Sequence, residues 1–216
     1  MLGCKLNIEG GIKILCLGSH CDDIEIGCGG TLLSLLKKYR HTEIFWVVFS
    51  SDSRREKEAR SSANIFLSHA ERKKIEILKY RNGFFPDNWG DIKTYFEKLK
   101  DMFTPDLIFT HYRNDLHQDH RTISELTWNT FRNHMILEYE IPKFDGDFGV
   151  PNLFVPLEDT ICQFKVTSII EIFKSQVDKH WLEKDLLFSV LRLRGMESVS
   201  PTKYAEAFYC RKINFE

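Results

Sequence analysis

Two short segments of the sequence concentrate imidazole and carboxylate side chains. The first segment, residues 18–30, holds His20, Asp22, Asp23 and Glu25 among several glycines. Carboxylates this close together repel one another unless a cation or hydrogen bonds compensate their charge. A bound metal ion is the simplest compensation. The alternative is structural: His20 would end a strand, and the carboxylates would cap the following helix, whose dipole favours negative charge there.

The second segment, residues 110–121, contains His111, His117 and His120 together with acidic residues. The chain has 8 histidines in 216 residues, so three in so short a segment exceed an even distribution. Imidazole titrates near neutral pH and binds metals, and a neighbouring carboxylate can fix its tautomer. The segment therefore predicts a metal site or acid–base chemistry. For His111 alone, a hydrogen-bonded histidine without a ligand role is the simpler interpretation.

The surrounding hydrophobic pattern predicts that these two segments meet. Apolar runs over residues 12–17 and 107–110 predict strands that each end just before one segment. Further strands are expected over 43–49, 75–78, 136–139 and 205–211, helices over 31–40, 56–67, 91–102, 121–133, 166–173 and 179–193, and a long loop over 141–156. This alternation predicts an α/β fold: one domain over residues 1–216, Rossmann-like, with a mostly parallel sheet and helices on both faces. Ligands of such sheets bind outside the carboxyl ends of the strands, where both segments would lie.

Combined, the two segments offer imidazoles and a carboxylate to one divalent ion. Catalytic zinc keeps three such protein ligands and leaves one position for water, whose pKa falls to about 7. The residues therefore predict metal-assisted hydrolysis. A competing interpretation of the first segment is a dinucleotide-binding turn. Its glycines, Gly27, Gly29 and Gly30, do not follow G-x-G-x-x-G, and this interpretation leaves His20 and the second segment unexplained.

Two motifs in these segments carry a family resemblance. Residues 20–23 read His-Cys-Asp-Asp before the glycines, and residues 117–121 read His-Gln-Asp-His-Arg after Asp115. In both, the chain resembles the PIG-L/LmbE-like family of metal-dependent de-N-acetylases. Weaker similarity extends over residues 55–60, 174–176 and 205–208. The departures are Cys21, where proline is common, and Ser53, where glycine often follows the aspartate.

The resemblance implies a role for each motif residue. It implies that His20, Asp23 and His120 bind the metal, usually zinc, although ferrous iron also serves. By the same resemblance, Asp22 is the general base toward the attacking water. His117 would polarise the amide carbonyl or stabilise the oxyanion, with Asp119 orienting it.

The implied reaction removes an N-acetyl group from an amino-sugar conjugate and gives acetate and a free amine. We expect a nucleotide-linked or surface-polysaccharide precursor as substrate. Arg55 and Arg113 are candidate substrate ligands because, with Arg54, they lie on the same predicted face and could meet a phosphate or sugar hydroxyls. The alternative for these arginines is simple solvation. A non-catalytic sugar- or nucleotide-binding module with the same fold is the alternative to the enzyme.

The composition limits the remaining classes of function. Lys and Arg total 30 against 31 Asp and Glu, so no basic surplus favours binding to nucleic acid. The longest apolar run, residues 44–49, is far shorter than the roughly 18 residues of a membrane span, so no transmembrane segment is expected. Six cysteines without a C-x-x-C pair predict reduced thiols and a cytoplasmic protein. The oligomeric state is not predicted.

Overall fold

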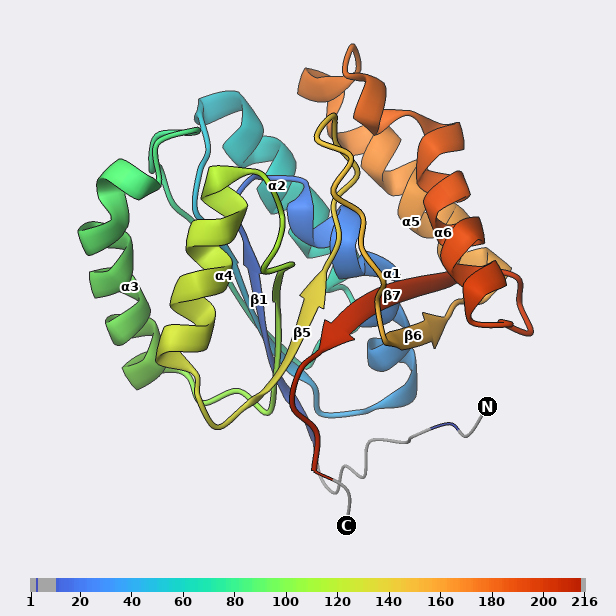
Figure 1. The fold of residues 1–216 in the computed structure, drawn as a ribbon, viewed down its shortest axis with the longest axis horizontal. Coiled ribbons are helices and arrows are strands. Elements are labelled where there is room, and N and C mark those ends of the chain that lie inside the picture. The colour runs from blue at the N-terminus through green and yellow to red at the C-terminus, as the bar shows by residue number, and fades with distance from the viewer. Residues whose placement is uncertain (1–2, 4–10, 215–216) are drawn as a thin grey trace.

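The computed structural model describes residue 3 and residues 11–214, which form a seven-stranded sheet with helices on both faces (Figure 1). The strands are β1 (Lys13–Gly18), β2 (Glu43–Val48), β3 (Arg72–Ile77), β4 (Leu107–His111), β5 (Met135–Tyr139), β6 (Leu153–Pro156) and β7 (Ala205–Cys210). The helices are α1 (Asp23–Lys38), α2 (Ser53–Phe66), α3 (Trp89–Met102), α4 (Gln118–Thr130), α5 (Asp159–Ile172) and α6 (Lys184–Glu197), with single 3-10 turns at η1 (Pro86–Asn88), η2 (Lys174–Gln176) and η3 (His180–Leu182). The α/β fold and the single domain predicted from the sequence are confirmed.

The strand order is β3-β2-β1-β4-β5-β7-β6. Strands β1 to β5 are parallel, whereas β7 runs antiparallel to both of its neighbours. From β1 the chain proceeds outward through β2 to β3, and then returns to place β4 on the other side of β1. This reversal makes the carboxyl ends of β1 and β4 the switch point of the sheet, where ligands of open α/β sheets bind.

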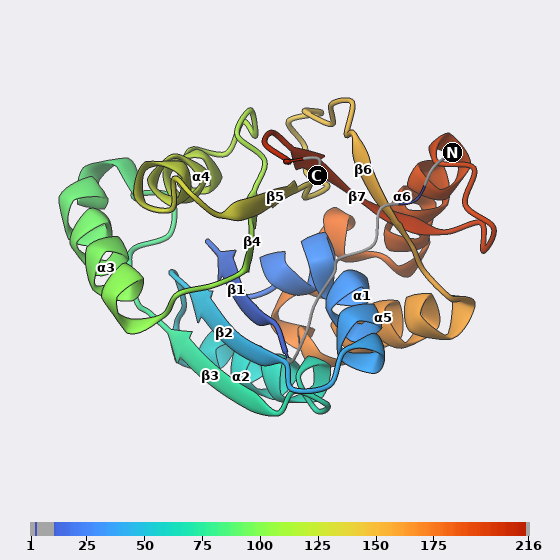
Figure 2. The ribbon, with the colours of Figure 1, turned by 90° about the horizontal axis from the view of Figure 1, so that it is seen from below.

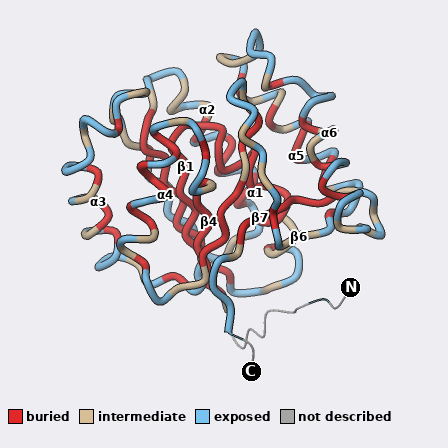
Figure 3. The backbone as a smooth tube through the Cα atoms, in the orientation of Figure 1, coloured by how far each residue is buried: buried red, intermediate tan, exposed pale blue. Residues whose placement is uncertain are grey.

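Alternating side chains of the strands build one hydrophobic layer on each face of the sheet. In β1, Ile14 and Cys16 pack in the layer beneath α1, α2, α5 and α6, whereas Leu15 and Leu17 pack toward α3 and α4. Figure 2 shows these helix layers on opposite faces, and Figure 3 shows the buried strands between them. The central parallel strands β1, β2, β4 and β5 are therefore buried on both faces, which explains their largely apolar sequences, whereas the edge strand β3 is charged and mostly exposed.

Helix α1 begins earlier than its sequence predicted. The helix expected over 31–40 begins at Asp23, so Gly27, Gly29 and Gly30 lie within it and not before it. Their missing side chains allow close packing. An added Cβ would lie 2.2 Å from the ring of Tyr139 at Gly27, and 2.7 Å from the ring of Phe66 at Gly29. Tertiary packing thus outweighs the low helix propensity of glycine.

The second half of the chain also departs from the prediction. The expected loop over 141–156 ends in β6, a short strand that pairs with β7. The helix expected over 179–193 is divided into η3 and α6, and α5 begins at Asp159 rather than at residue 166. Among the described residues, none of the helices has both the length and the apolarity needed to span a membrane.

Candidate metal centre

The two polar segments lie side by side at the switch point of the sheet. His20 lies in the turn between β1 and α1, and His120 lies in the first turn of α4, which follows β4. His20 Nδ1 and His120 Nε2 are 3.1 Å apart, although the residues are 100 positions apart in the chain. The two segments therefore lie next to each other, as the sequence predicted.

A triangle of potential ligand atoms forms at this point. Asp23 Oδ2 lies 3.4 Å from His20 Nδ1 and 3.6 Å from His120 Nε2. Bonds of about 2.0–2.2 Å in a tetrahedral shell put neighbouring ligand atoms about 3.3–3.6 Å apart, so the triangle matches the spacing of a zinc shell. Two overlapping groups also have ligand atoms within 4.8 Å of one another: His20, His117 and His120, and Asp23, His111 and His120.

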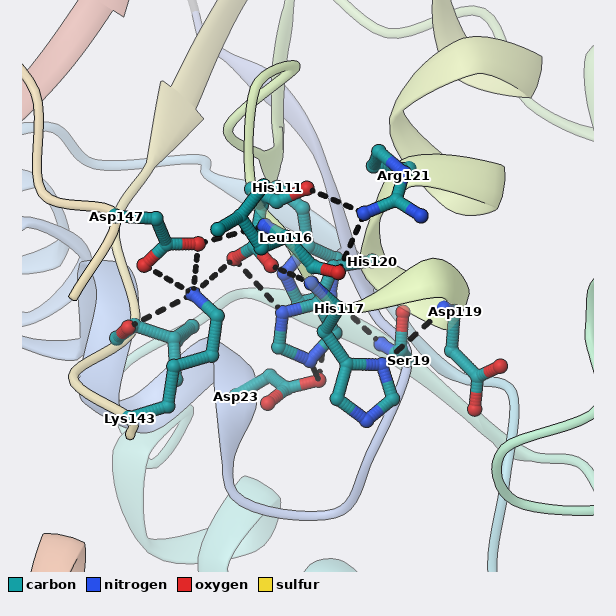
Figure 4. A network of polar contacts seen from close by, with 12 residues as sticks. Ser19, Asp23, His111, Leu116, His117, Asp119, His120, Arg121, Lys143 and Asp147 are labelled. Atoms are coloured by element: carbon teal, nitrogen blue, oxygen red, sulfur yellow. Dashed lines mark hydrogen bonds and ion pairs between the residues drawn. The ribbon is translucent and has the colours of Figure 1, made fainter. Parts of the chain in front are cut away.

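Asp115 fixes the orientation of His120 through the ring nitrogen that does not face His20. His120 Nδ1 lies 2.9 Å from Asp115 Oδ2, an arrangement that protonates Nδ1 and leaves Nε2 free for a metal (Figure 4). Lys143 in the β5–β6 loop donates to the same oxygen at 2.8 Å and also to Asp147. Burial raises the pKa of Asp115, but the bonds from His120 and Lys143 outweigh burial and hold that pKa well below its usual range.

The supporting roles of Asp115 and Lys143 were not predicted from the sequence. Asp115 was visible only as the start of a motif, at a position two residues before His117. Lys143 gave no signal, because it lies in a segment whose sequence indicates only a loop. A contact across 28 residues, between this lysine and Asp115, depends on the folded path of that loop.

Asp119 does not orient His117 through its carboxylate, so the expected pairing of these two side chains is wrong. Asp119 Oδ2 lies 3.2 Å from His20 Nε2, and the carboxylate also accepts from the N–H groups of Gly83 at 2.6 Å and Phe85 at 3.1 Å. These two amides, from the β3–α3 loop, pull the carboxylate toward His20. Asp119 thus orients a candidate ligand instead.

The imidazole of His117 is held by a backbone N–H group, whereas its own backbone N–H donates to Asp115 Oδ1 at 2.8 Å. Its Nδ1 accepts the N–H of Asp119 at 3.2 Å, which places the proton of the neutral ring on Nε2. Burial and the neighbouring His20 lower the pKa of His117. The neutral imidazole can therefore donate a hydrogen bond from Nε2 at the edge of the cluster.

Asp22 lies beside the cluster with one oxygen occupied. Arg55 Nη2 donates to Asp22 Oδ1 at 2.8 Å. Asp52 caps α2 by accepting the N–H groups of Arg54 and Arg55, both at 2.8 Å, and so sets the first turn from which Arg55 extends. Burial raises the pKa of Asp22, and the positive charge of Arg55, which lowers that pKa, only partly offsets the effect of burial. Arg55, expected as a substrate ligand, instead contacts the predicted base.

Arg113 is not brought to the cluster. Its guanidinium lies 4.8 Å from the ring centre of Trp128, and its Nε lies 3.9 Å from Glu138. Both contacts draw the side chain toward α4 and β5, so the expectation that Arg113 and Arg55 share one substrate face is wrong. Arg113 instead packs at the outer side of the loop after β4.

His111 was expected to be a hydrogen-bonded histidine without a ligand role, and its ring lies in contact with the cluster. Its Nε2 accepts the N–H of Ser19 at 2.9 Å, as a hydrogen-bonded histidine would. The same nitrogen lies 3.2 Å from Asp23 Oδ2, and the ring stacks on His120 with centres 3.9 Å apart. Its Nδ1 is buried without a hydrogen-bond partner among the described residues. His111 therefore forms the wall behind Asp23.

Two of the weaker motifs contact each other. Glu58 Oε1 accepts the N–H of Ser175 at 2.9 Å, and the Ser175 hydroxyl donates to the other oxygen of the same carboxylate. This contact ties α2 to η2. The third motif, residues 205–208, lies in β7, and its Glu206 reaches α1.

Fold and cluster together define an α/β protein with a histidine–carboxylate centre at the switch point of its sheet. The family model described as PIG-L: GlcNAc-PI de-N-acetylase matches residues 15–131, more than half of the chain. The protein belongs to this family.

Solved structures share the fold at low sequence identity. The conserved protein TT1542 from Thermus thermophilus superposes with a TM-score of 0.71 at 18% identity, covering 95% of this chain and 97% of that one. For the N,N'-diacetylchitobiose deacetylase from Pyrococcus horikoshii the TM-score is 0.65 at 21% identity, with coverage of 91% and 82%. GalB, the 4-carboxy-2-hydroxymuconate hydratase from Pseudomonas putida, has a TM-score of 0.69 at 13% identity, with coverage of 95% and 98%. Identity this low supports a common fold only.

Proposed function

We propose that this protein is a metal-dependent hydrolase that removes the N-acetyl group of an amino-sugar conjugate and releases acetate and a free amine. The observation that carries the proposal is the triangle of His20, Asp23 and His120, with Asp22 beside it. The family description and the chitobiose deacetylase, which shares the fold, support the same reaction class. Residues 1–216 would form one catalytic domain.

The chemistry of these donors fits a divalent metal. Two imidazole nitrogens and one carboxylate oxygen are the ligands of catalytic zinc sites, and they also suit ferrous iron. We assign His20, Asp23 and His120 as the ligands, with Asp119 and Asp115 orienting the two imidazoles. When bound, the metal would supply Lewis-acid polarisation of the amide carbonyl.

Asp22 is positioned to move the proton of the attacking water. Because Arg55 occupies Oδ1, the other carboxylate oxygen takes the proton. A carboxylate that accepts this proton can return it to the leaving nitrogen, so one residue serves both half-reactions. Its buried position excludes bulk water from the proton transfer.

His117 is positioned to stabilise the charge that develops on the carbonyl oxygen. Its Nδ1 is engaged by the backbone N–H of Asp119, so the neutral ring donates from Nε2. A donor fixed before the reaction stabilises the oxyanion without the cost of reorganisation. This role needs the neutral imidazole, and the lowered pKa of His117 is consistent with it.

We propose a soluble substrate, either a nucleotide-linked amino sugar or a polysaccharide precursor, handled in the cytoplasm. Arg54 is the remaining basic side chain of the face that was expected to meet phosphate. Unlike Arg55, it is largely exposed, and its Nε is 3.8 Å from Glu58.

The decisive experiment measures acetate release from a panel of N-acetylhexosamine conjugates: free, nucleotide-linked and glycosidic. We expect release from at least one member, abolished by a chelator and restored by Zn²⁺ or Fe²⁺. Absence of release from every member, with metal stoichiometrically bound, would contradict the proposal and favour a binding module.

The GalB comparison makes a hydratase the sharpest rival within the same fold. The two reactions are distinguished by their products, because hydrolysis of an amide yields equal amounts of acetate and amine. A hydratase would add water to a carbon–carbon double bond and release neither. Amine and acetate should therefore be quantified in the same reaction.

A further inference from the structure

Two side chains form hydrogen bonds with the backbone in the middle of α1. The N–H groups of Gly30 and Thr31 donate to the carboxylate of Glu206, at 2.8 and 2.7 Å. The carbonyl of Ile26, four residues before Gly30 and therefore its partner in a regular α-helix, accepts from Lys165 Nζ at 2.6 Å. These three bonds attach α1 to α5 and β7.

Lys165 and Glu206 form a buried ion pair whose direction matches the helix. They come from α5 and β7, and their charged atoms are 2.5 Å apart with almost no exposure to solvent. The carboxylate faces N–H groups and the ammonium faces a carbonyl, which is the arrangement that peptide dipoles favour. A buried ion pair contributes little stability beyond an apolar pair of similar size, so its distinct effect is a fixed geometry.

The first turn of α1 carries Asp23, the carboxylate ligand of the proposed metal centre. Gly27 of the same helix packs against Tyr139 so closely that an added Cβ would lie 2.2 Å from the ring. The Tyr139 hydroxyl donates to the carbonyl of Leu17 at 2.6 Å and lies 3.3 Å from His111 Nε2. The same nitrogen is 3.2 Å from Asp23 Oδ2. A small rotation of this first part of α1 would therefore move Asp23 away from the two imidazoles.

We propose that Lys165 and Glu206 are positioning residues, which hold the first turns of α1 so that Asp23 reaches the metal centre formed with His20 and His120. This inference rests on the proposed function, because it assumes that centre. The two residues lie outside the part of the chain that the family model matches. The part of the chain beyond residue 131 thus sets the geometry of a site whose proposed ligands all lie within residues 15–131.

The test replaces both charges with apolar side chains, in the double variant Lys165→Leu/Glu206→Leu. The change removes both charges together, so neither is left buried without a partner. Replacement of a buried ion pair by apolar side chains is often neutral for stability, so we expect the variant to fold. Binding of Co²⁺ is followed through its visible absorption spectrum, which reports coordination geometry without any substrate. We expect the dissociation constant to rise by at least about tenfold, with a changed spectrum, while the far-ultraviolet circular dichroism stays native.

The charge-exchanged variant Lys165→Glu/Glu206→Lys separates the direction of the charges from their presence. It keeps a pair but places the ammonium at the N–H groups of Gly30 and Thr31, so we expect it to bind Co²⁺ no better than the double leucine variant. If neither double variant folds, Glu206→Gln decides by the same readout, since it keeps the volume and removes one acceptor.

Arg211→Met provides the matched control. Arg211 pairs with the fully buried Glu138 on β5, at 2.6 Å, and removing it also takes the nearer cation from a buried carboxylate, which keeps only Arg113 at 3.9 Å among the ion pairs of the described residues. We expect this variant to lose stability and to keep the wild-type Co²⁺ affinity and spectrum. Folded Lys165/Glu206 variants that bind Co²⁺ like the wild type would overturn the positioning role alone. A wild-type protein that binds no Co²⁺ would overturn the proposed metal centre, and the positioning role with it.

Discussion

Arg55 and Asp22 are joined by a hydrogen bond of 2.8 Å across 33 residues of sequence, from Nη2 to Oδ1. The contact leaves one oxygen of Asp22 for chemistry and fixes the plane of its carboxylate. It also places a permanent positive charge beside the proposed base. The catalytic role of Asp22 and the positioning role of Arg55 can therefore be tested separately.

Asp22→Ala tests the base itself. Because Asp22 is not one of the three proposed ligands, we expect the variant to keep stoichiometric metal and to lose at least about 100-fold in kcat. Metal content by atomic emission and acetate release on the same preparation provide the measurement. Asp22→Asn serves as the isosteric control, and wild-type turnover in either variant would remove Asp22 from the mechanism.

Arg55→Met tests the positioning of that base. We expect kcat to fall by about 10- to 100-fold with KM little changed, because the substitution frees the carboxylate without removing a substrate contact. Arg60→Met is the control: Arg60 lies on the same helix, pairs with Glu56 and donates to the carbonyl of Ile75 at 3.5 Å, and its replacement should leave both constants unchanged. A rise in KM alone would instead assign Arg55 to substrate binding.

Lys143→Met tests the support behind His120. Lys143 holds Asp115, which in turn holds His120 Nδ1, so its loss loosens a ligand without touching the metal. Outer partners of this kind change metal affinity by about 10–100-fold, and we expect a loss of that size in competition with a chromophoric chelator. Lys37→Met, which removes an exposed pair with Glu158, should have no effect. Equal affinities in the two variants would contradict the role of Lys143.

Metal binding should release a proton from His20. Burial lowers the pKa of this imidazole, but Asp23 and Asp119 outweigh burial and raise that pKa to about 10 in the metal-free protein. At neutral pH the ring is therefore protonated, and a metal at Nδ1 must displace the proton. The affinity for Zn²⁺ should consequently rise with pH between about pH 6 and pH 8, by up to about tenfold per unit. Calorimetry in buffers of different ionisation enthalpy counts the protons released, and a count of zero would contradict the assignment of His20 as a ligand.

Gly27→Ala tests the close packing of α1 on the sheet. The added Cβ would lie 2.2 Å from the Tyr139 ring, so the free energy of unfolding should fall by about 1–3 kcal/mol. Gly90→Ala, in α3, places its Cβ in open space and should raise that free energy by about 0.5–1 kcal/mol. Urea titrations of both variants measure the difference. A rise in the free energy of unfolding for both variants would show that helix propensity, and not packing, decides at Gly27.

The sheet was predictable because its strands carry their own signal. The central strands β1, β2 and β4 are largely apolar runs, and β1 and β4 end close to the predicted positions, whereas the edge strand β3 begins with three basic residues. The start of α1 was not predictable, since its glycines argue locally against a helix. The side chains that make glycine necessary there come from distant parts of the chain: Tyr139 at Gly27, Phe66 at Gly29 and Leu157 at Gly30. β6 was missed for a similar reason: four residues near two prolines form a strand only beside β7.

The approach of the two polar segments was predictable from topology, but the pairing of side chains within the cluster was not. Asp119 is adjacent in sequence to His120 and two residues from His117, yet its carboxylate bonds to His20. That choice depends on the N–H groups of Gly83 and Phe85, in a loop more than thirty residues away. Residue types and spacing therefore identify which side chains gather, whereas loop paths decide which of them touch.

His20 and His120 are separated by 100 residues, and this distance has a consequence for the growing chain. During synthesis, β1 and the His-Cys-Asp-Asp turn leave the ribosome long before α4 exists. The centre cannot close until β4 has taken its place next to β1, and Lys143 can support His120 only after β5 has emerged. A metal bound at this centre would then link His20 to His120, and so would disfavour local unfolding of the chain between them. Loading of the proposed centre would therefore be a late event in maturation, and we expect that depletion of metal during expression leaves a folded chain that unfolds more readily.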